Sequence, residues 1–371
     1  MAKYRFDQVA RECRTTFKGD KNGMPIVGLE HLVPNEMLVR DFEVDTENTF
    51  TKSFKQGQIL FGRRRAYQQK AGVAQFDGIC SGDITVIEAI PGKIEPNLLP
   101  FIVQNEQFFE HAVQGSAGSL SPRVKWEHLA SYEIELPTME KQRVLADKLW
   151  TAYRLKESYK KLLAATDEMV KSQFIEMFGN CLQVEKLSSL CDTFLDGDWI
   201  ESKDQSDEGI RLVQTGNVGN GIFKNKEEKC RFISDKTFDR LHCTEIFSGD
   251  ILVSRLPDPI GRACMIPNGL GRMITAVDCS IIRLKESILP DFFIAYTMTP
   301  TYRAQINEVT TGTTRRRVSR ANLGNVKVPV PPMEQQQQFV SIAHQADKSK
   351  FELRKSTEAI DRVIKSLINN V

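Results

Sequence analysis

The sequence lacks the features that most readily assign a chain to a membrane, a secretory route or a metal site. No apolar run reaches the roughly 18–20 residues of a membrane span, and residues 1–6 carry no apolar stretch of a secretory signal. It has five histidines, and its eight cysteines form no Cys-x-x-Cys pair, so a zinc site is hard to build. We expect a cytoplasmic protein with reduced thiols and no metal site.

Motifs for catalysis are also missing. There is no Gly-x-x-x-x-Gly-Lys-Ser/Thr phosphate loop, and residues 330–333 (Val-Pro-Pro-Met) lack the polar and aromatic residues of an adenine methyltransferase motif. The glycine-rich segment 216–221 has no strand-then-helix pattern around it, and we interpret it as a turn. No acidic residues form a convincing nuclease set. We therefore predict neither catalytic residues nor a cofactor in this chain.

Composition leaves the function open. The chain has 371 residues, 41% of them hydrophobic and 26% charged, as in an ordinary soluble protein of two or three domains. Its net charge is only +2. If the ligand is DNA, local clusters of cations must meet the phosphates, because the surface as a whole is not basic.

The strongest signal is an internal repeat. A shift of 194 residues places segment 117–177 on 311–371 without a gap, and 15 of the 61 positions are identical. Unrelated sequences of ordinary composition would share about four. Upstream the repeat continues with a changing shift: Gly57–Arg63 matches Gly249–Arg255 at 192, and Ser81–Ile87 matches Ala276–Ile282 at 195.

A weaker match at a shift of 186 pairs residues 24–27 with 210–213. Changing shifts indicate insertions, which chains tolerate in surface loops. Each half of the chain is therefore expected to contain the same short strands joined by loops of different length and content.

Two long helices are predicted, from Met139 to about Phe178 and from Met333 to Val371, in segments rich in helix formers. About 38 residues give a helix of ~57 Å. Apolar residues recur at spacings of three, four and seven, which favours a seam between two helices. The predicted seam residues are Leu145, Leu149, Ala152, Tyr159, Leu163, Val170, Phe339, Ala346, Leu353, Ile360 and Leu367.

The predicted fold class is α+β: two repeated mixed α/β domains, each followed by a long helix, with the two helices pairing as an antiparallel coiled coil. The boundaries are 1–138 for the first domain, 139–180 for its helix, 181–332 for the second domain and 333–371 for the last helix. A helical hairpin buried in one ordinary core is the alternative. Equivalent groove faces of B-DNA recur every ~34–36 Å, so a stiff spacer between two domains suits a split DNA sequence.

Basic and polar clusters in the first domain are candidate DNA contacts. Arginine forks recognise phosphate or guanine, and glutamine recognises adenine. Small residues with hydroxyls let the backbone approach phosphate. The candidates, against the alternative of solvated basic loops, are Arg63, Arg64, Arg65, Tyr67, Gln68, Gln69, Lys70, Ser119, Arg123 and Lys125.

The second domain repeats the pattern in segment 310–320, where Gly312 matches Gly118 and Arg317 matches Arg123. Arg255 and Arg262 occupy the place of the first arginine cluster and are weaker candidates, as is Asn217. The full set of candidates here is Asn217, Arg255, Arg262, Thr313, Thr314, Arg315, Arg316, Arg317 and Arg320.

The chain resembles the specificity subunits of type I restriction–modification systems. The resemblance is carried by the junction before each helix, Glu135–Gln142 and Pro329–Gln336, which is similar to the family's Pro-Pro-x-x-Glu-Gln entry, and by the Gly-Ser/Thr and Arg-Val loop before it. Thr138 and Lys141 depart from that pattern, which leaves the start of the first helix open. The resemblance covers the whole chain.

The resemblance implies a division of labour. Each recognition domain would read one half of a bipartite, asymmetric site in double-stranded DNA, and the helices would set the gap and dock two methyltransferase subunits. S-adenosylmethionine, ATP and Mg would belong to those and to the restriction (motor-nuclease) subunits. Two rival functions remain: a self-contained methyltransferase or nuclease, which would act on DNA alone, and a coiled-coil adaptor without a DNA role.

The spacer interpretation makes a prediction. Inserting about four residues, one helical turn, at Ala164-Ala165 should change the number of base pairs between the half-sites, because the helix would set their separation. The bases read within each half-site should stay the same. Methylation mapping in cells checks both, and an unchanged gap would rule out the helix as a ruler.

Overall fold

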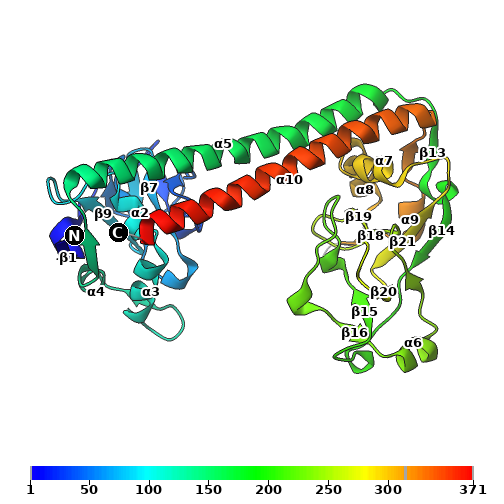
Figure 1. Ribbon diagram of the computed structural model, residues 1–371, viewed down its shortest axis with the longest axis horizontal. Coiled ribbons are helices and arrows are strands. Elements are labelled where there is room, and N and C mark those ends of the chain that lie inside the picture. The colour runs from blue at the N-terminus through cyan, green and yellow to red at the C-terminus, as the bar shows by residue number, and fades with distance from the viewer. Residues whose placement is uncertain (1, 313–315, 370–371) are drawn as a thin grey trace. The chain divides into compact units, whose positions relative to one another are not determined.

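The computed structural model describes residues 2–312 and 316–369. It divides into two compact units, each of which contains part of both long helices (Figure 1). Unit 1 comprises Met1–Lys161 and Arg354–Val371, and unit 2 comprises Leu162–Leu353. Each unit has its own apolar core.

Unit 1 contains a five-stranded sheet in the order β2-β9-β6-β7-β4 and a three-stranded sheet in the order β3-β8-β5. The strands are β2 (Ala10–Glu12), β3 (Ile26–Val27), β4 (Leu38–Val39), β5 (Lys52–Phe54), β6 (Ile59–Gly62), β7 (Ala71–Ala74), β8 (Gly78–Cys80) and β9 (Ile84–Ala89). Two small pairs complete it, β1 (Ala2–Arg5) with β12 (Glu133–Leu136) and β10 (Ser116–Ala117) with β11 (Arg123–Val124). The helices are α1 (Phe6–Val9), α2 (Leu99–Val103), α3 (Glu106–Gln114) and α4 (Trp126–Ala130), with 3-10 turns η1 (Leu29–His31) and η2 (Ala66–Gln68).

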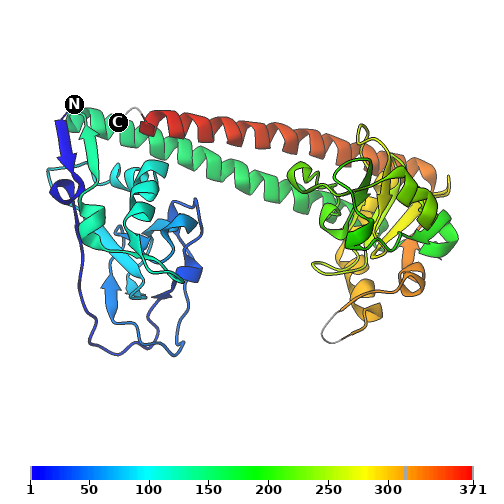
Figure 2. The ribbon, with the colours of Figure 1, turned by 90° about the horizontal axis from the view of Figure 1, so that it is seen from below.

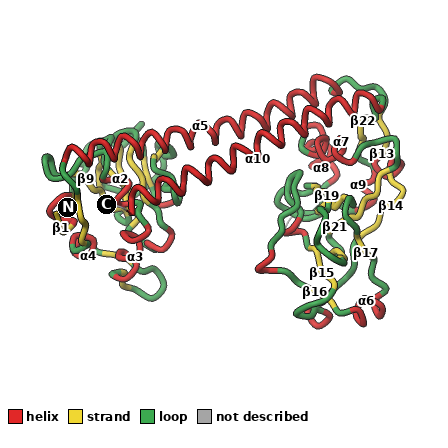
Figure 3. Tube along the Cα trace, viewed as in Figure 1, coloured by secondary structure: helices red, strands yellow, loops and turns green. Residues whose placement is uncertain are grey.

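Unit 2 contains two four-stranded sheets, in the orders β14-β21-β18-β19 and β16-β15-β20-β17. The strands are β14 (Cys191–Asp196), β15 (Ile210–Val213), β16 (Phe232–Ile233), β17 (Glu245–Ile246), β18 (Ile251–Ser254), β19 (Ala263–Met265), β20 (Met273–Thr275) and β21 (Cys279–Leu284), and β13 (Val184–Lys186) pairs with β22 (Lys327–Pro329). The shorter helices are α6 (Asp235–Leu241), α7 (Pro290–Thr297), α8 (Pro300–Val309) and α9 (Arg320–Gly324), with 3-10 turns η3 (Leu187–Leu190), η4 (Ser202–Asp204), η5 (Thr215–Asn217) and η6 (Glu227–Lys229). Figure 3 distinguishes helices, strands and loops.

The strand order confirms the repeat and its changing shift. In unit 1 β3 runs parallel to β8 with Ile26 opposite Ile79, and in unit 2 β15 runs parallel to β20 with Leu212 opposite Ile274. These pairs stand 186 and 195 residues apart, as the sequence matches predict. The units differ where insertions were expected. In unit 1, β4 lies at an edge of the five-stranded sheet, whereas in unit 2 β16 and α6 follow β15 along the chain and precede β17. The α+β class is confirmed.

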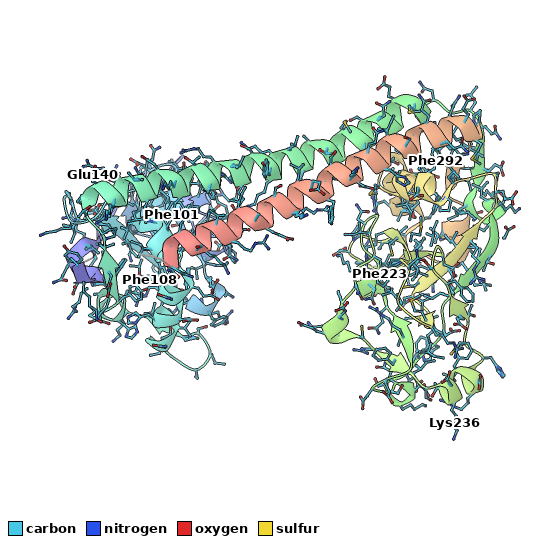
Figure 4. The ribbon with its side chains drawn as sticks, in the orientation of Figure 1. Phe101, Phe108, Glu140, Phe223, Lys236 and Phe292 are labelled. Carbon is cyan, nitrogen blue, oxygen red and sulfur yellow. The ribbon has the colours of Figure 1, made fainter. Side chains whose placement is uncertain are left out.

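Aromatic side chains fill both cores. In unit 1 the fully buried Phe108 packs on Phe6 and Phe61, with ring centroids 4.8 and 5.8 Å away. In unit 2 the fully buried Phe292 lies against three aromatic rings of the long helices, Phe174 and Phe178 at 5.0 Å and Phe339 at 6.2 Å. Figure 4 labels Phe108 and Phe292. The long helices thus belong to the cores as well as to each other.

The two long helices are α5 (Met139–Phe178) and α10 (Met333–Asn369). They lie side by side and run in opposite directions (Figures 1 and 2). Of the eleven predicted seam residues, four are buried (Leu149, Val170, Phe339 and Ala346) and the other seven are partly buried. The spacing pattern missed Tyr153 and Phe174, which are also buried.

An ion pair between the helices occurs once in each unit and uses repeated residues. In unit 1 the Lys156 ammonium lies 2.6 Å from the Asp361 carboxylate, and in unit 2 the Lys350 ammonium lies 2.8 Å from Asp167. Lys156 and Lys350 occupy equivalent positions of the repeat, as do Asp167 and Asp361. Each pair therefore joins the lysine of one copy to the aspartate of the other, which explains two of the fifteen identical positions of the repeat.

A buried glutamine explains the junction that precedes each helix. Gln336 is fully buried; its amide oxygen accepts from the Leu289 backbone N–H at 2.9 Å, and its amide nitrogen donates to the carbonyls of Ser287 and Pro331 at 3.0 and 2.9 Å. Gln142 makes the equivalent bonds from Glu95 and to Pro137, both at 2.9 Å. Each glutamine thus fastens the start of a long helix to the loop that leads into α7 or α2.

The eight cysteines are all free, and burial raises the pKa of Cys80 and of Cys264 to about 12. Such thiols are inert at neutral pH. Within residues 2–312 and 316–369, no cluster of three or more His, Cys, Asp or Glu side chains is arranged to bind a metal ion. Among the same residues, no helix combines the length and apolarity that crossing a membrane requires.

Replacing Gln336 with Ala should lower the free energy of unfolding by about 2 kcal/mol, because the partly buried Leu289 N–H loses its acceptor inside the protein. Gln337→Ala, at the exposed next position, should change it by less than about 0.5 kcal/mol. Denaturant unfolding measures both. Equal stability of the two variants would show that the junction glutamine does not fasten the helix.

Candidate nucleic-acid interface

In unit 1 the first arginine cluster is a tight, irregular turn after β6. Arg65 and Gln69 have φ of +54° and +53°, and between them the one-turn η2 is anchored by the buried Ala66. Left-handed backbone at non-glycine residues persists only where surrounding contacts hold it. Tyr67, at the tip, is 58% exposed. The turn therefore displays an aromatic ring beside arginines.

The structure brings the two predicted clusters of unit 1 together. The Val124 N–H donates to the Arg63 carbonyl at 3.0 Å, and the Arg65 N–H donates to the Pro122 carbonyl at 2.8 Å. Arg64 and Arg123 face each other in an antiparallel bridge. Residues almost sixty positions apart in the sequence thus form one basic surface, and we call Arg63, Arg64, Arg65, Tyr67 and Arg123 the unit 1 arginine surface.

Asp83 is the acidic residue in contact with this surface. Its carboxylate lies 2.6 Å from the Arg123 Nε and 3.5 Å from the Arg64 Nη1. The hydrogen bond from Arg123 lowers the pKa of the Asp83 carboxyl below its ordinary value, so Asp83 stays ionised at neutral pH. The Nε atoms of Arg63, Arg64 and Arg65 are buried without a hydrogen-bond partner. The surface therefore keeps an excess of positive charge.

The remaining candidates of unit 1 are less uniform. Ser119 and Lys125 are exposed, whereas Gln68 and Gln69 are half-buried. The half-buried Lys70 donates through Nζ to the Leu29 carbonyl at 2.7 Å. Lys70 is thus engaged in fixing η1 against the turn, and the exposed residues are better placed to meet a ligand.

In unit 2 the matching loop has the same frame. The Thr311 and Arg317 backbones exchange two hydrogen bonds of 2.9 Å in an antiparallel bridge, and the Val318 N–H donates to the Arg255 carbonyl at 3.2 Å. Arg316 and Arg317 are exposed. Three of the predicted contacts, Thr313, Thr314 and Arg315, lie outside the described residues.

Arg320 is the first residue of α9. The Ser319 hydroxyl accepts from the Asn322 N–H at 3.1 Å and caps this helix. The Arg320 guanidinium donates to the Phe194 carbonyl at 3.3 Å and lies 3.8 Å from the Asp196 carboxylate. Its side chain remains 42% exposed, so it is available to a ligand.

Two of the predicted contacts are corrected by the structure. Arg262 is 6% exposed, and its guanidinium donates to the carbonyls of four residues, Thr215, Val218, Leu256 and Pro259, at 2.7–2.9 Å. Arg255 is 4% exposed and donates to the Val277 carbonyl at 2.6 Å. They match Arg63 and Lys70 in backbone position, but loop 255–262 folds over them, so they organise neighbouring loops and are not surface contacts.

Asn217 is likewise committed to its own turn. Its amide oxygen accepts from the Gln214 N–H at 2.9 Å, and its amide nitrogen donates to the Lys224 carbonyl at 3.0 Å. Segment 215–217 is a 3-10 turn, which confirms the turn interpretation of the glycine-rich segment. The partly buried Asn217 stays a predicted DNA contact that also holds its own turn.

Two features beside these surfaces could not be predicted from the sequence. In unit 2, Trp199 is 70% exposed and lies three residues after Asp196, in the loop that follows β14. In unit 1, Asp83 lines an open groove of about 630 Å³ whose walls carry several hydroxyls. Those hydroxyl residues are Thr15, Thr16, Thr49, Thr51 and Ser81. A lone tryptophan and scattered threonines form no pattern that spacing can detect.

The chemistry of the two surfaces is recognition. Guanidinium groups, hydroxyls and an exposed aromatic ring suit phosphate oxygens and base edges. Asp83 and Asp196 are engaged with arginines. Among the residues of these surfaces that the structure describes, none form a paired acid and base or a nucleophile beside an activating base.

Arg262 should matter for stability. Arg262→Ala should lower the free energy of unfolding by about 3 kcal/mol, because four backbone carbonyls, among them that of the buried Val218, lose their donor. The control Arg272→Ala removes two exposed ion pairs, to Asp235 and Glu245, and should cost less than about 1 kcal/mol. Thermal or denaturant unfolding checks the difference. Wild-type stability with weaker DNA binding would restore Arg262 as a direct contact.

Comparison with known proteins agrees with this geometry. The family described as type I restriction modification DNA specificity domain matches residues 9–165 and 182–361. The type I restriction enzyme EcoDI specificity subunit of Escherichia coli is 23% identical over 186 residues, which cover 47% of this chain and 40% of that protein. A protein of Methanocaldococcus jannaschii, assigned as the specificity subunit of the type I restriction enzyme MjaX, is 20% identical over 94% of this chain and 86% of its own length.

Solved structures share the fold. A chain of a type I restriction–modification system, from work on its complex assembly and conformational transition, has a TM-score of 0.61 at 16% identity and covers 99% of this chain and 96% of its own. The S subunit of the type I system of M. genitalium has a TM-score of 0.56 at 12% identity, with 99% and 94% covered. Two matched domains, one in each half of the repeat, identify this chain as a member of the type I restriction–modification DNA specificity family.

Proposed function

We propose that this chain reads a bipartite, asymmetric DNA site, with one recognition domain on each half, as the specificity subunit of a type I restriction–modification enzyme. The observation that carries the proposal is an antiparallel pairing at the same place in each unit, of Ala117 with Arg123 in unit 1 and of Thr311 with Arg317 in unit 2. We call these two arginine-bearing pairings the hairpins. Equivalent frames with different side chains suit two half-sites of different sequence.

The charge distribution supports the proposal. The net charge is only +2, yet the unit 1 arginine surface contains four arginines, of which only Arg64 and Arg123 pair with the Asp83 carboxylate. In unit 2, Arg316, Arg317 and Arg320 follow one another closely. Local positive charge of this kind releases counterions from DNA and gives affinity without a globally basic protein.

We assign catalysis to partner subunits. Two methyltransferase subunits would bring S-adenosylmethionine, restriction subunits would bring ATP and Mg, and the whole would work on DNA in the cytoplasm. On α5, Leu155, Leu162 and Met169 recur every seven residues and are 44–51% exposed. An apolar stripe that α10 leaves exposed supports the docking of partner helices there.

Replacing Arg315, Arg316 and Arg317 with Ala should weaken DNA binding and flatten its dependence on salt. The slope of log affinity against log salt should fall by about 0.9 for each arginine that neutralises a phosphate. Assembly with the methyltransferase should survive, because the long helices are untouched. Binding titrations across a salt series and size-exclusion chromatography measure the two effects.

A charge-matched control is Lys348, Arg354 and Lys355 to Ala on α10, which are exposed and lie outside both hairpins. This variant should keep wild-type DNA affinity. If both variants lose binding equally, net charge and not the hairpin carries the interaction. If the purified chain alone methylates or cuts DNA, it is an enzyme and not a recognition subunit.

A further inference from the structure

The equivalent arginines of the two hairpins have different surroundings. In unit 1 the Arg123 Nε lies 2.6 Å from one Asp83 oxygen and its Nη2 lies 3.3 Å from the other. The carboxylate thus accepts two hydrogen bonds from one edge of the guanidinium. The Arg123 side chain is still 47% exposed. For Arg317, its counterpart, no carboxylate lies within ion-pair distance among residues 2–312 and 316–369.

Asp83 itself is held in place. Its carbonyl accepts from the Arg63 N–H at 2.9 Å, and its own N–H donates to the Ser81 hydroxyl at 3.2 Å. The same carboxylate also contacts Arg64, whose other terminal nitrogen donates to the Ser121 hydroxyl at 2.9 Å. One aspartate therefore fixes two arginines that arrive from different segments of the chain.

A guanidinium that is gripped on one edge has a fixed plane and direction. Reading guanine requires two parallel hydrogen bonds to N7 and O6, which depend on that direction, whereas a phosphate accepts a cation over a wide range of angles. A fixed fork loses less conformational entropy on binding. The negative charge of Asp83 also offsets part of the positive charge of the arginines, which weakens their attraction to the phosphates of DNA of any sequence.

We propose that Asp83 is a positioning residue for sequence recognition, an inference that rests on the proposed function. Asp83 orients Arg123 and Arg64 toward base edges, whereas Arg317 contacts the DNA backbone. The two hairpins thus share a frame and perform different tasks. The first discriminates between bases, and the second contributes affinity.

Unit 2 has a comparable contact between an aspartate and an exposed arginine at a different position. Asp196, at the end of β14, lies 3.4 Å from the buried Arg255 and 3.8 Å from the half-exposed Arg320, and it accepts from the Ser280 hydroxyl at 3.2 Å. Here the aspartate ends β14, whereas Asp83 lies in the turn before β9, and the exposed arginine that Asp196 contacts is Arg320. A carboxylate beside an exposed arginine thus occurs in both units without being inherited through the repeat.

The test compares Asp83→Asn with wild type in the complex with the methyltransferase, on the duplex identified by methylation mapping and on a duplex of random sequence. Affinity for the random duplex should rise several-fold, discrimination should fall about tenfold, and the salt slope for the random duplex should steepen by about 0.9. Asp83→Glu, which restores the carboxylate, should recover part of the discrimination. Asp77→Asn, which breaks the exposed ion pair to Lys55, is the matched control and should leave both affinities unchanged.

Lysine substitutions separate the two hairpins, because lysine keeps the charge and loses the fork. Arg123→Lys should lose discrimination, whereas Arg317→Lys should keep it. Unchanged discrimination in Asp83→Asn, or an equal loss of affinity on both duplexes, overturns the inference and leaves the proposed function standing. A wild-type complex that prefers no sequence overturns both.

Discussion

The structure depends on the burial of two apolar stripes that neither long helix can cover alone. Leu149 and Val170 on α5, and Phe339 and Ala346 on α10, are removed from water by the partner helix and by the adjoining domain. Burial of such side chains is worth about 1.5–3 kcal/mol each for the larger ones. The repeated ion pairs add register: the lysine of each copy meets the aspartate of the other, which requires the helices to run antiparallel.

The pairing of the two helices also determines which parts of the repeat keep one register and which parts can diverge. The buried glutamines, Gln142 and Gln336, tie each helix start to its domain, and the hairpin that precedes them keeps its backbone bonds in both units. These positions keep a single shift of 194 residues, because inserting or deleting one residue would rotate the apolar face of the helix away from its partner. The loops between the strands carry no such constraint, and they have diverged in length and charge.

Much of the fold could be predicted from the sequence because it follows from periodicity. The ends of α5 and the start of α10, the matched strands and the changing shift were all predicted, since spacing and repetition are visible in one dimension. Tyr153 and Phe174 were missed because a domain, and not only the second helix, covers them. The sequence showed Gln142 only as a residue that is identical in both copies of the repeat, without indicating that it is buried.

The candidate site was less predictable. The arginine clusters were recognised by composition, but exposure is a property of the folded loop: Arg255 and Arg262 share the alignment of Arg63 and Lys70 and yet lie inside. Asp83 and Trp199 gave no signal, because their importance arises from neighbours distant in sequence. Side chains that carry recognition are thus fixed by loop geometry, which a repeat of the frame does not determine.

The central claim, that one chain reads two different half-sites, is tested most directly by sequencing methylated adenines in cells with and without this gene. The account predicts a single bipartite, asymmetric motif, with a fixed gap, that is methylated only when the chain is present. A methylation pattern that is unchanged by removal of the gene, or a motif with only one continuous half, would contradict it.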